Sequence, residues 1–425
     1  MNSPIRPVLR DGTCEAVESF RASRIPGAIS RKIRLRDGTS HATTFCMPGP
    51  RGQSPSEMAN AADRAFLQTK HWPAEGRGRT IWIADLFSGC GAMSLGIWEA
   101  CRALGLRMKV RLAVDIDGYA AQTYKLNYPA ANVVCSDVDN LLDGELGHAR
   151  TRNECRLARF LGALDLACGG PPCQGNSDLN NWTRRNDPKN GLYARMARLA
   201  EVARPRNLIV ENVPAVCHDK SRVVERTCDR LTKAGYNVSH AVIELSRLGL
   251  PQSRKRHVLV ASLEHDIDLE AECKRFSTDT RTVEWAIGDL RDLKSISPLD
   301  LPTKMASDTI TRIEYLFNSG IYDLPDDKRP DCHRLKAHSY KSVYGRMRWH
   351  DPAQTITSGF TCMGQGRFVH PSKRRTITPH EAARLQFIPD FFQFPEGTPR
   401  TIIARLIGNA VPPRLSYILA LAVLR

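Results

Sequence analysis

The sequence predicts an α/β fold built around one open, mostly parallel β-sheet. Short apolar runs, which suit strands covered on both faces, alternate along the chain with stretches whose apolar residues recur at helical spacing. Strands that alternate with helices in this way form parallel sheets, and ligands bind at the carboxyl ends of their strands. The predicted strands are residues 81–87, 110–116, 132–135, 164–168 and 207–210.

The first predicted strand, residues 81–87, leads into a glycine-rich turn and then into a helix that begins near Met93. The turn lacks the G-x-G-x-x-G pattern of dinucleotide-binding proteins, because Ser94 stands where the third glycine should be. A nucleoside cofactor without a pyrophosphate therefore fits better than a dinucleotide. Asp115, at the end of the second predicted strand, would hold the ribose hydroxyls of such a cofactor.

A cysteine follows the fourth predicted strand. Residues 164–168 are followed by two glycines, two prolines and then Cys173, a composition that makes a tight turn with few backbone donors. Cys173 is a candidate nucleophile, although a buried cysteine that only packs would give the same pattern.

Five polar residues at one edge of the sheet indicate a shared site. The residues at or near predicted strand ends are Asp85, Asp115, Asp137, Cys173 and Glu211.

The pattern changes in the second half of the chain. Residues 238–245 and 257–261 predict an antiparallel pair of strands. Residues 264–350 are short segments separated by prolines, with a cluster of basic and aromatic residues toward their end. They predict either a small separate domain or a surface insertion.

Regular structure returns near the end of the chain. Thr378, Pro379 and Glu381 form the signature of a capped helix start. A second tight turn, poor in backbone donors, occupies residues 408–413, and residues 414–424 predict a final apolar helix that docks on the sheet.

Residues 1–78 are rich in Arg, Pro, Ser and Gly and predict a basic, partly ordered extension. Within it, the alternating residues 31–36 and the Asp37-Gly38 turn predict one hairpin, and residues 57–69 predict one helix. Two interpretations of the extension stay open, an additional contact with DNA and a loosely ordered tail.

The composition points to a polyanionic partner. The 425 residues include 61 Lys and Arg against 45 Asp and Glu, a net charge of +16, and nucleic acid is the commonest partner of such a chain. No apolar run of about 18 residues predicts a membrane span, and the first residues lack the apolar core of a signal peptide. The 13 cysteines form no paired CxxC sets with zinc spacing, so we expect no metal site and reduced thiols in a cytoplasmic protein.

Five motifs follow one another in an order that identifies a family. They are DLFSGCG at residues 85–91, GPPCQ at 170–174, ENV at 211–213, QSRKR at 252–256 and GNAV at 408–411. Together they resemble the motifs of the cytosine-5 DNA methyltransferases, and the resemblance spans about residues 80–425. It implies a Rossmann-like, S-adenosylmethionine-dependent large domain and a smaller, irregular target-recognition domain. The implied units are the extension (1–78), the catalytic domain (79–263), the target-recognition domain (264–370) and a C-terminal segment that returns to the catalytic domain (371–425).

The resemblance also implies catalytic roles. Cys173 matches the nucleophile that adds to C6 of a cytosine flipped out of duplex DNA, and Glu211 matches the acid that bonds N3 of the ring. Arg254 and Arg256 match cations that hold the base and its phosphate. The chemistry is sound for these residue types, because a thiolate is strongly nucleophilic and leaves readily, and because a stacked base is out of reach until it is flipped.

Further residues match the family's cofactor and DNA contacts. Asp115 stands where the family usually has Glu, Ile116 where some members have an aromatic residue, and Asn176 where an aromatic residue usually precedes Ser177. The expected S-adenosylmethionine contacts are Phe87, Ser88, Gly89, Gly91, Asp115, Ile116, Asp137, Pro172, Asn409 and Val411. The expected DNA-binding residues are Ser177, Arg184 and Arg185 in the loop after the nucleophile, Gln252 as a supporting residue, and Arg346 and Arg348 in the target-recognition domain.

Two other functions remain compatible with these motifs. An RNA cytosine-5 methyltransferase acting on transfer RNA can carry the same set, and a catalytically silent or regulatory DNA-binding protein can retain the fold. The separate basic domain favours duplex DNA over RNA, and the intact Cys173, Glu211 and arginines favour an enzyme. We expect a monomer that acts on duplex DNA, alongside a cognate restriction or defence system.

Overall fold

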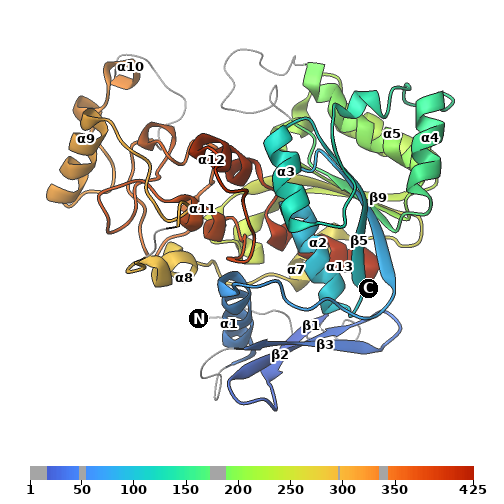
Figure 1. Cartoon of the computed structure of the whole chain (residues 1–425), viewed down its shortest axis with the longest axis horizontal. Helices are drawn as coiled ribbons and strands as arrows, with labels where there is room; N and C mark the ends of the chain where they lie inside the picture. Colours follow the sequence, from blue (N-terminus) through green and yellow to red (C-terminus); the bar gives the residue numbers. More distant parts are fainter. Residues whose placement is uncertain (1–16, 47–53, 173–187, 295–296, 335–342) are drawn as a thin grey trace.

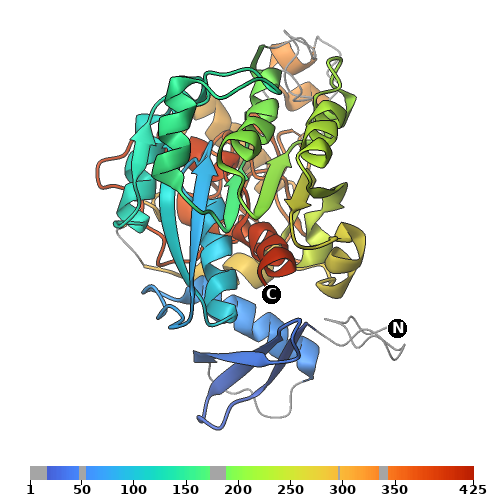
Figure 2. The same ribbon diagram turned by 90° about the vertical axis from the view of Figure 1, so that its right-hand side faces the viewer.

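The computed structural model describes residues 17–46, 54–172, 188–294, 297–334 and 343–425. Figure 1 shows an α/β part that holds the central sheet and a small N-terminal sheet below it. Beside the α/β part lies a less regular part, which carries α9 (Ser307–Asn318) and α10 (Asp331–Arg334). The same small sheet lies below the main body in Figure 2, which views the chain from the side.

A seven-stranded sheet in the order β6-β5-β4-β7-β8-β11-β9 forms the centre of the α/β part. Neighbouring strands are parallel from β6 to β8, whereas β11 runs antiparallel to both β8 and β9. The sheet confirms the predicted α/β fold and the predicted antiparallel pair. The strands are β4 (Thr80–Leu86), β5 (Arg107–Asp115), β6 (Val133–Cys135), β7 (Leu166–Gly169), β8 (Asn207–Asn212), β9 (Asn237–Glu244) and β11 (Lys255–Ser262).

Hydrophobic cores cover both faces of this sheet. Successive strand residues belong to different cores: Ile209 lies in one core and its neighbours Leu208 and Val210 lie in the other. This alternation is expected when side chains point to opposite faces of a strand. The helices that contribute to the first core include α2 (Ala92–Ala103), α3 (Gly118–Asn127) and α13 (Pro413–Leu424), and those of the second are α4 (Arg152–Leu161), α5 (Ala194–Ala203) and α6 (Val223–Lys233).

The stretch Arg400–Leu424 is long and apolar enough to cross a membrane by length and composition alone, with a mean hydropathy of 1.4. However, 89% of the apolar 18-residue segment within this stretch is buried inside the fold, as is usual for the core helices of a globular protein. The stretch comprises two helices, α12 (Arg400–Asn409) and α13, and α12 was not predicted from the sequence.

The less regular part has a third, smaller core. Ile313 and Leu316 of α9 (Ser307–Asn318) pack in it with Leu324 and Val369. A core of its own favours a small domain over a surface insertion. The predicted helix start at Thr378 is confirmed by the capping box of α11 (Pro379–Leu385). The remaining elements are α7 (Leu269–Arg275), α8 (Val283–Ile287), α10 (Asp331–Arg334) and the short parallel pair β10 (Gln252–Ser253) and β12 (Ala353–Gln354).

The N-terminal region is more ordered than the sequence predicts. The hairpin is confirmed, but it belongs to a three-stranded antiparallel sheet that packs with a helix on the first core of the α/β part. The described residues of the predicted extension thus form a small folded unit, and residues 1–16 and 47–53 lie outside the described part of the chain. Alternate residues give the sheet an apolar face despite its basic composition, and Phe20, Ile29 and Ile33 lie on that face. The elements are β1 (Glu18–Ala22), β2 (Ala28–Arg34), β3 (Ser40–Cys46) and α1 (Pro55–Gln68).

Buried ion pairs join the N-terminal sheet to α2 and α13. Arg31 of β2 lies 2.8 Å from Glu99 of α2 and donates to the hydroxyl of Tyr417 in α13 at 3.2 Å. The Tyr417 hydroxyl in turn donates to Glu18 at 2.7 Å. Burial alone would raise the pKa of Glu99, but Arg102 and Arg31 outweigh it and lower that pKa. The charges are therefore matched, as burial requires.

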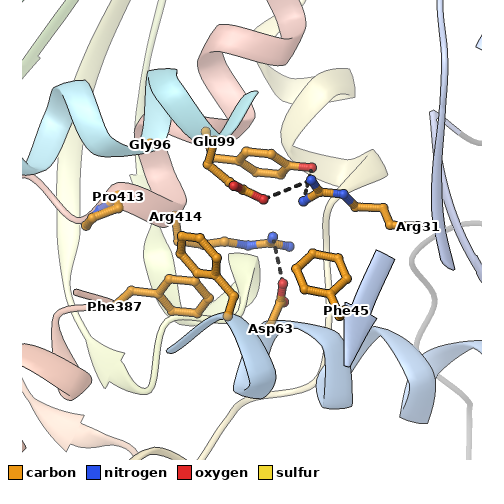
Figure 3. Close-up of a pocket in the computed structure, with 10 residues that line it drawn as sticks. Arg31, Phe45, Asp63, Gly96, Glu99, Phe387, Pro413 and Arg414 are labelled. Carbon is orange, nitrogen blue, oxygen red and sulfur yellow. Dashed lines mark hydrogen bonds and ion pairs between the residues drawn. The ribbon is translucent and has the colours of Figure 1, made fainter. Parts of the chain in front are cut away.

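Asp63 of α1 is the centre of a second buried group of charges. Its Oδ2 lies 2.5 Å from Arg281, which precedes α8, and its Oδ1 lies 3.5 Å from Arg414 of α13. Figure 3 shows Asp63 and Arg414 facing each other in a small cavity that Arg31 and Glu99 also line. One carboxylate thus holds the N-terminal helix, the α/β part and the segment that leads into the less regular part.

We predict that Asp63→Ala lowers the free energy of unfolding by about 3–5 kcal/mol, because it leaves two buried arginines without their carboxylate. Urea unfolding followed by circular dichroism measures this loss. Asp308→Ala is the matched control, since Asp308 is 77% exposed in its pair with Arg312 and should matter little. Equal losses in the two variants would contradict the role of Asp63.

Candidate active site

The register of the parallel strands brings the predicted site residues to one edge of the sheet. Leu86 pairs with Gly169 and Gly169 pairs with Val210, so the turns after β4, β7 and β8 leave the sheet side by side. The turn after β4 begins at Phe87 and the turn after β7 begins at Gly170, while Glu211 is the penultimate residue of β8. The shared edge expected from the sequence is therefore present in the described part of the chain.

An ion pair marks the centre of this edge. Arg256 Nε lies 2.7 Å from Glu211 Oε1, and their side chains are only 13% and 10% exposed. The pair fixes the direction of the carboxylate. The other oxygen, Oε2, faces the turn after β7, because a Cβ atom added to Gly170 would lie 3.4 Å from it and 3.2 Å from Val411. A side chain at Gly170 would press on Val411 and would lie in contact with the Glu211 carboxylate.

The turn after β7 is also tied to β8. The Asn212 side chain donates to the carbonyl of Pro171 at 3.2 Å and accepts from the amide of Val213 at 2.8 Å. Thus β8 supplies both the acid and the support of the turn that leads to the predicted nucleophile. Cys173, Ser177, Arg184 and Arg185 lie outside the described residues, and their roles stay predictions.

Two other cysteines near this edge are poor nucleophiles. Burial raises the pKa of Cys90 to about 12 and raises the pKa of Cys168 well above its ordinary value. Neither thiol gives appreciable thiolate near neutral pH, and the thiolate is the reactive form. Among the described residues, no group of three or more His, Cys, Asp or Glu side chains is arranged to hold a metal ion.

Gln252 does not face DNA, so its assignment as a DNA-binding residue is wrong. Its side chain is fully buried, donates to the carbonyl of Leu385 at 2.7 Å and to Gln386 Oε1 at 2.9 Å, and accepts from the amide of Ile356 at 3.0 Å. These bonds use both hydrogens and the oxygen of the amide. Only the weaker expectation, that Gln252 supports the site, agrees with this geometry.

Arg254 also differs from its prediction. It is buried, and its guanidinium donates to the carbonyls of Ile356 at 2.9 Å and Ala410 at 3.4 Å. Because Arg254 donates to the carbonyl of Ala410, the residue before Val411, it holds the turn that follows α12. Arg256 is the cation that lies on Glu211.

Gln386 is a site-supporting residue that sequence reasoning missed. Its amide donates to the carbonyl of Ile407 at 2.7 Å and to that of Gly408 at 3.4 Å, while it accepts from Gln252. Two buried amides therefore connect β10 to the end of α12, just before Asn409. The two amides are 134 positions apart in the sequence, and only the fold brings them together.

The turn after β4 has the backbone of a ligand-binding loop. Phe87 and Gly91 have φ values of 56° and 92°, and the Tyr128 hydroxyl donates to the carbonyl of Gly91 at 3.0 Å. Phe87 is a bulky residue with a positive φ, a strained state that often occurs at ligand-binding turns. Ser88 is buried, and its hydroxyl has no hydrogen-bond partner among the described residues, so it is available to a ligand.

The ends of β5 and β6 complete this surface. Asp115 accepts from the amides of Gly89 at 2.8 Å and Asp117 at 2.9 Å, which uses one lone pair on each oxygen and leaves others for ligand hydroxyls. Burial raises the pKa of Asp115. The next residue, Ile116, is 71% exposed, an unusual state for a large apolar side chain. Asp137 and Asn409 are exposed as well, and Pro172 and Val411 are half-buried.

The two arginines predicted to contact DNA differ in their surroundings. Arg346 donates to the carbonyl of Pro371 at 2.8 Å and lies over the rings of Phe317 and Tyr322 at 4.1 and 4.7 Å. Arg348 is exposed and lies over Tyr322 at 4.6 Å. Arg346 is thus held within the less regular part, whereas Arg348 is presented to solvent.

We predict that Gln252→Ala lowers the free energy of unfolding by about 1–3 kcal/mol, because it leaves buried backbone and amide groups unsatisfied. The salt dependence of DNA binding should stay unchanged, since no phosphate contact is lost. Thermal unfolding and binding titrations at several salt concentrations measure the two effects. A flatter salt dependence with unchanged stability would restore the assignment of Gln252 to the DNA interface.

Comparisons with known proteins agree with this site. Residues 81–425 match the family model of the C-5 cytosine-specific DNA methylases. The Type II methyltransferase M1.BsuMI of Bacillus subtilis is 42% identical over 396 residues, which cover 93% of this chain and 92% of that protein. The Type II methylase M.HgiDII of Herpetosiphon aurantiacus is 30% identical over 355 residues, which cover 81% and 95%.

A solved structure shares the fold. The Entamoeba histolytica methyltransferase EhMeth superposes with a TM-score of 0.54 at 15% identity, covering 81% of this chain and 98% of that one. From the family match, the relatives and the geometry of the site, the chain belongs to the C-5 cytosine-specific DNA methylase family and is a DNA cytosine-5 methyltransferase.

Proposed function

We propose that this methyltransferase moves the methyl group of S-adenosylmethionine to C5 of a cytosine flipped out of a specific duplex DNA sequence. The reaction passes through a covalent bond between Cys173 and C6 of the ring. The observation that carries the proposal is the Glu211–Arg256 pair, directed at the turn that leads to Cys173.

Cys173 and Glu211 have complementary tasks in this reaction. The thiolate of Cys173 adds to C6, which makes C5 electron-rich, while Glu211 acts as an acid that donates a proton to N3 and so neutralises the negative charge that develops on the ring. Arg256 keeps the Glu211 carboxylate aimed at the base and supplies a positive charge nearby. After methyl transfer, loss of the proton on C5 re-forms the double bond and expels the thiolate from C6.

The residues at the carboxyl edge fit S-adenosylmethionine, which supplies an electrophilic methyl group when bound. Ile116 and Phe87 offer apolar surface to the adenine, and Asp115 accepts from the ribose hydroxyls. Ser88, Gly89 and Gly91 line the turn beside the methionine portion. The orphaned Ser88 hydroxyl and the exposed Ile116 side chain are the observations that favour this fit. Asp137, Pro172, Asn409 and Val411 complete the proposed contacts.

We assign DNA recognition to the less regular part and to the loop after Cys173. Ser177, Arg184 and Arg185 in that loop would contact the DNA around the vacated position. Arg348 is the better candidate in the less regular part, because Arg346 is engaged by its neighbours. We infer a monomer in the cytoplasm, paired with a restriction or defence system, as the names of the Type II relatives suggest.

Cys173→Ser should abolish methyl transfer while DNA binding persists, because a hydroxyl is far less nucleophilic at neutral pH. Duplex DNA containing 5-fluorocytosine should trap the wild type as a covalent adduct, which peptide mapping locates. Cys46→Ser, which changes an exposed thiol of the N-terminal sheet, is the control. An adduct on Cys90 or Cys168 would exclude Cys173 as the nucleophile.

Glu211→Gln should reduce turnover by about 10²- to 10⁴-fold, the usual effect of losing an acid–base group, with little change in cofactor binding. Single-turnover transfer from labelled S-adenosylmethionine measures it. Duplex DNA and transfer RNA are compared in the same assay. Turnover close to that of the wild type would show that Glu211 is structural, and transfer to RNA alone would replace DNA as the substrate.

A further inference from the structure

An ion pair crosses from the end of the chain to the proposed cofactor surface. Arg405 Nη2 of α12 pairs with Asp117 Oδ2, although the two residues are 288 positions apart in the sequence. Figure 1 shows α12 beside α3, the helix that Asp117 caps through the amide of Tyr119. The pair thus joins the C-terminal segment to the turn after β5.

The two partners lie next to proposed cofactor contacts. Asp117 directly follows Asp115 and the exposed Ile116, and its amide donates to Asp115 at 2.9 Å. Arg405 stands four residues before Asn409 on α12, so both project from the same side of the helix, and both are exposed. The pair therefore connects the adenosyl wall of the site to the wall that carries Asn409 and Val411.

The pair is poorly placed to serve stability. The side chains of Arg405 and Asp117 are 44% and 24% exposed, and exposed ion pairs add little to the free energy of unfolding. The charges of the pair nevertheless act on Asp115, a proposed cofactor contact. Burial raises the pKa of Asp115, and the backbone amides of Asp117 and Gly89 lower it. The charge of Asp117 raises this pKa, whereas the charge of Arg405 lowers it and so favours the Asp115 carboxylate.

We propose that Arg405 and Asp117 form a latch that positions the two walls of the S-adenosylmethionine site against each other. Both are positioning residues, since they act through Ile116, Asp115 and Asn409. The inference rests on the proposed function. It predicts that the latch contributes to cofactor affinity and leaves the stability of the cofactor-free protein almost unchanged.

The test is the dissociation constant of S-adenosylmethionine, measured by calorimetry on the full chain without DNA. Arg405→Gln and Asp117→Asn should each weaken binding about three- to tenfold, and the double variant should be no weaker than either single one. Asn is chosen at 117 because it keeps the cap of α3. Arg405→Lys should recover most of the affinity, and high salt should weaken the wild type more than the variants.

The control is Arg206→Gln, which removes an exposed pair with Glu264 near the start of β8, at the opposite edge of the sheet. It should leave the dissociation constant unchanged. Wild-type affinity in both single variants, or additive losses in the double variant, would overturn the latch. Weakening by Arg405→Gln alone would also overturn it and indicate a direct contact with the cofactor. If the wild type binds no S-adenosylmethionine, the proposed function itself fails.

Discussion

The in-register pairing of β4, β7 and β8 is the constraint on which the site depends. Parallel strands release their turns at one edge, so a glycine-rich turn, the proline turn before Cys173 and an acid become neighbours. Because β11 is antiparallel to β8, its first residues lie at the carboxyl ends of the parallel strands, where His257 pairs with Asn212 at the end of β8. That single reversal delivers Arg256 to Glu211 and places a cation among acidic residues.

A second set of interactions brings the C-terminal segment to this edge. Gln252, Gln386 and Arg254 are buried, and their hydrogen bonds converge on the backbone between Ile356 and Ala410. Buried polar groups of this kind tolerate few alternative arrangements, because every lost partner is costly. The wall of the site that carries Val411 is thus fixed by residues that touch neither cofactor nor DNA.

The sequence predicted the sheet well because its strands are apolar runs bounded by turn residues, a local signal. Its motifs pointed to Glu211 and Arg256, and the fold brings these two side chains together as an ion pair, while their catalytic roles stay predictions. The prediction failed at Gln252 and Arg254, because the sequence of a motif does not show whether a polar side chain faces solvent or bonds a buried backbone carbonyl. It also underestimated residues 17–78, where charged residues such as Arg31 and Asp63 are buried with partners hundreds of positions away.

The N-terminal sheet contacts the last described helix, α13, and this contact limits the order in which the parts of the chain can assemble. The hydroxyl of Tyr417 bonds Glu18 across 399 positions, and Arg36 donates to the carbonyl of Ala422 across 386. On a ribosome, the N-terminal strands emerge first but lack these partners until α13 has been made. Such long-range contacts slow folding. Nascent chains that stop before Pro413 should therefore stay sensitive to proteases in their N-terminal strands.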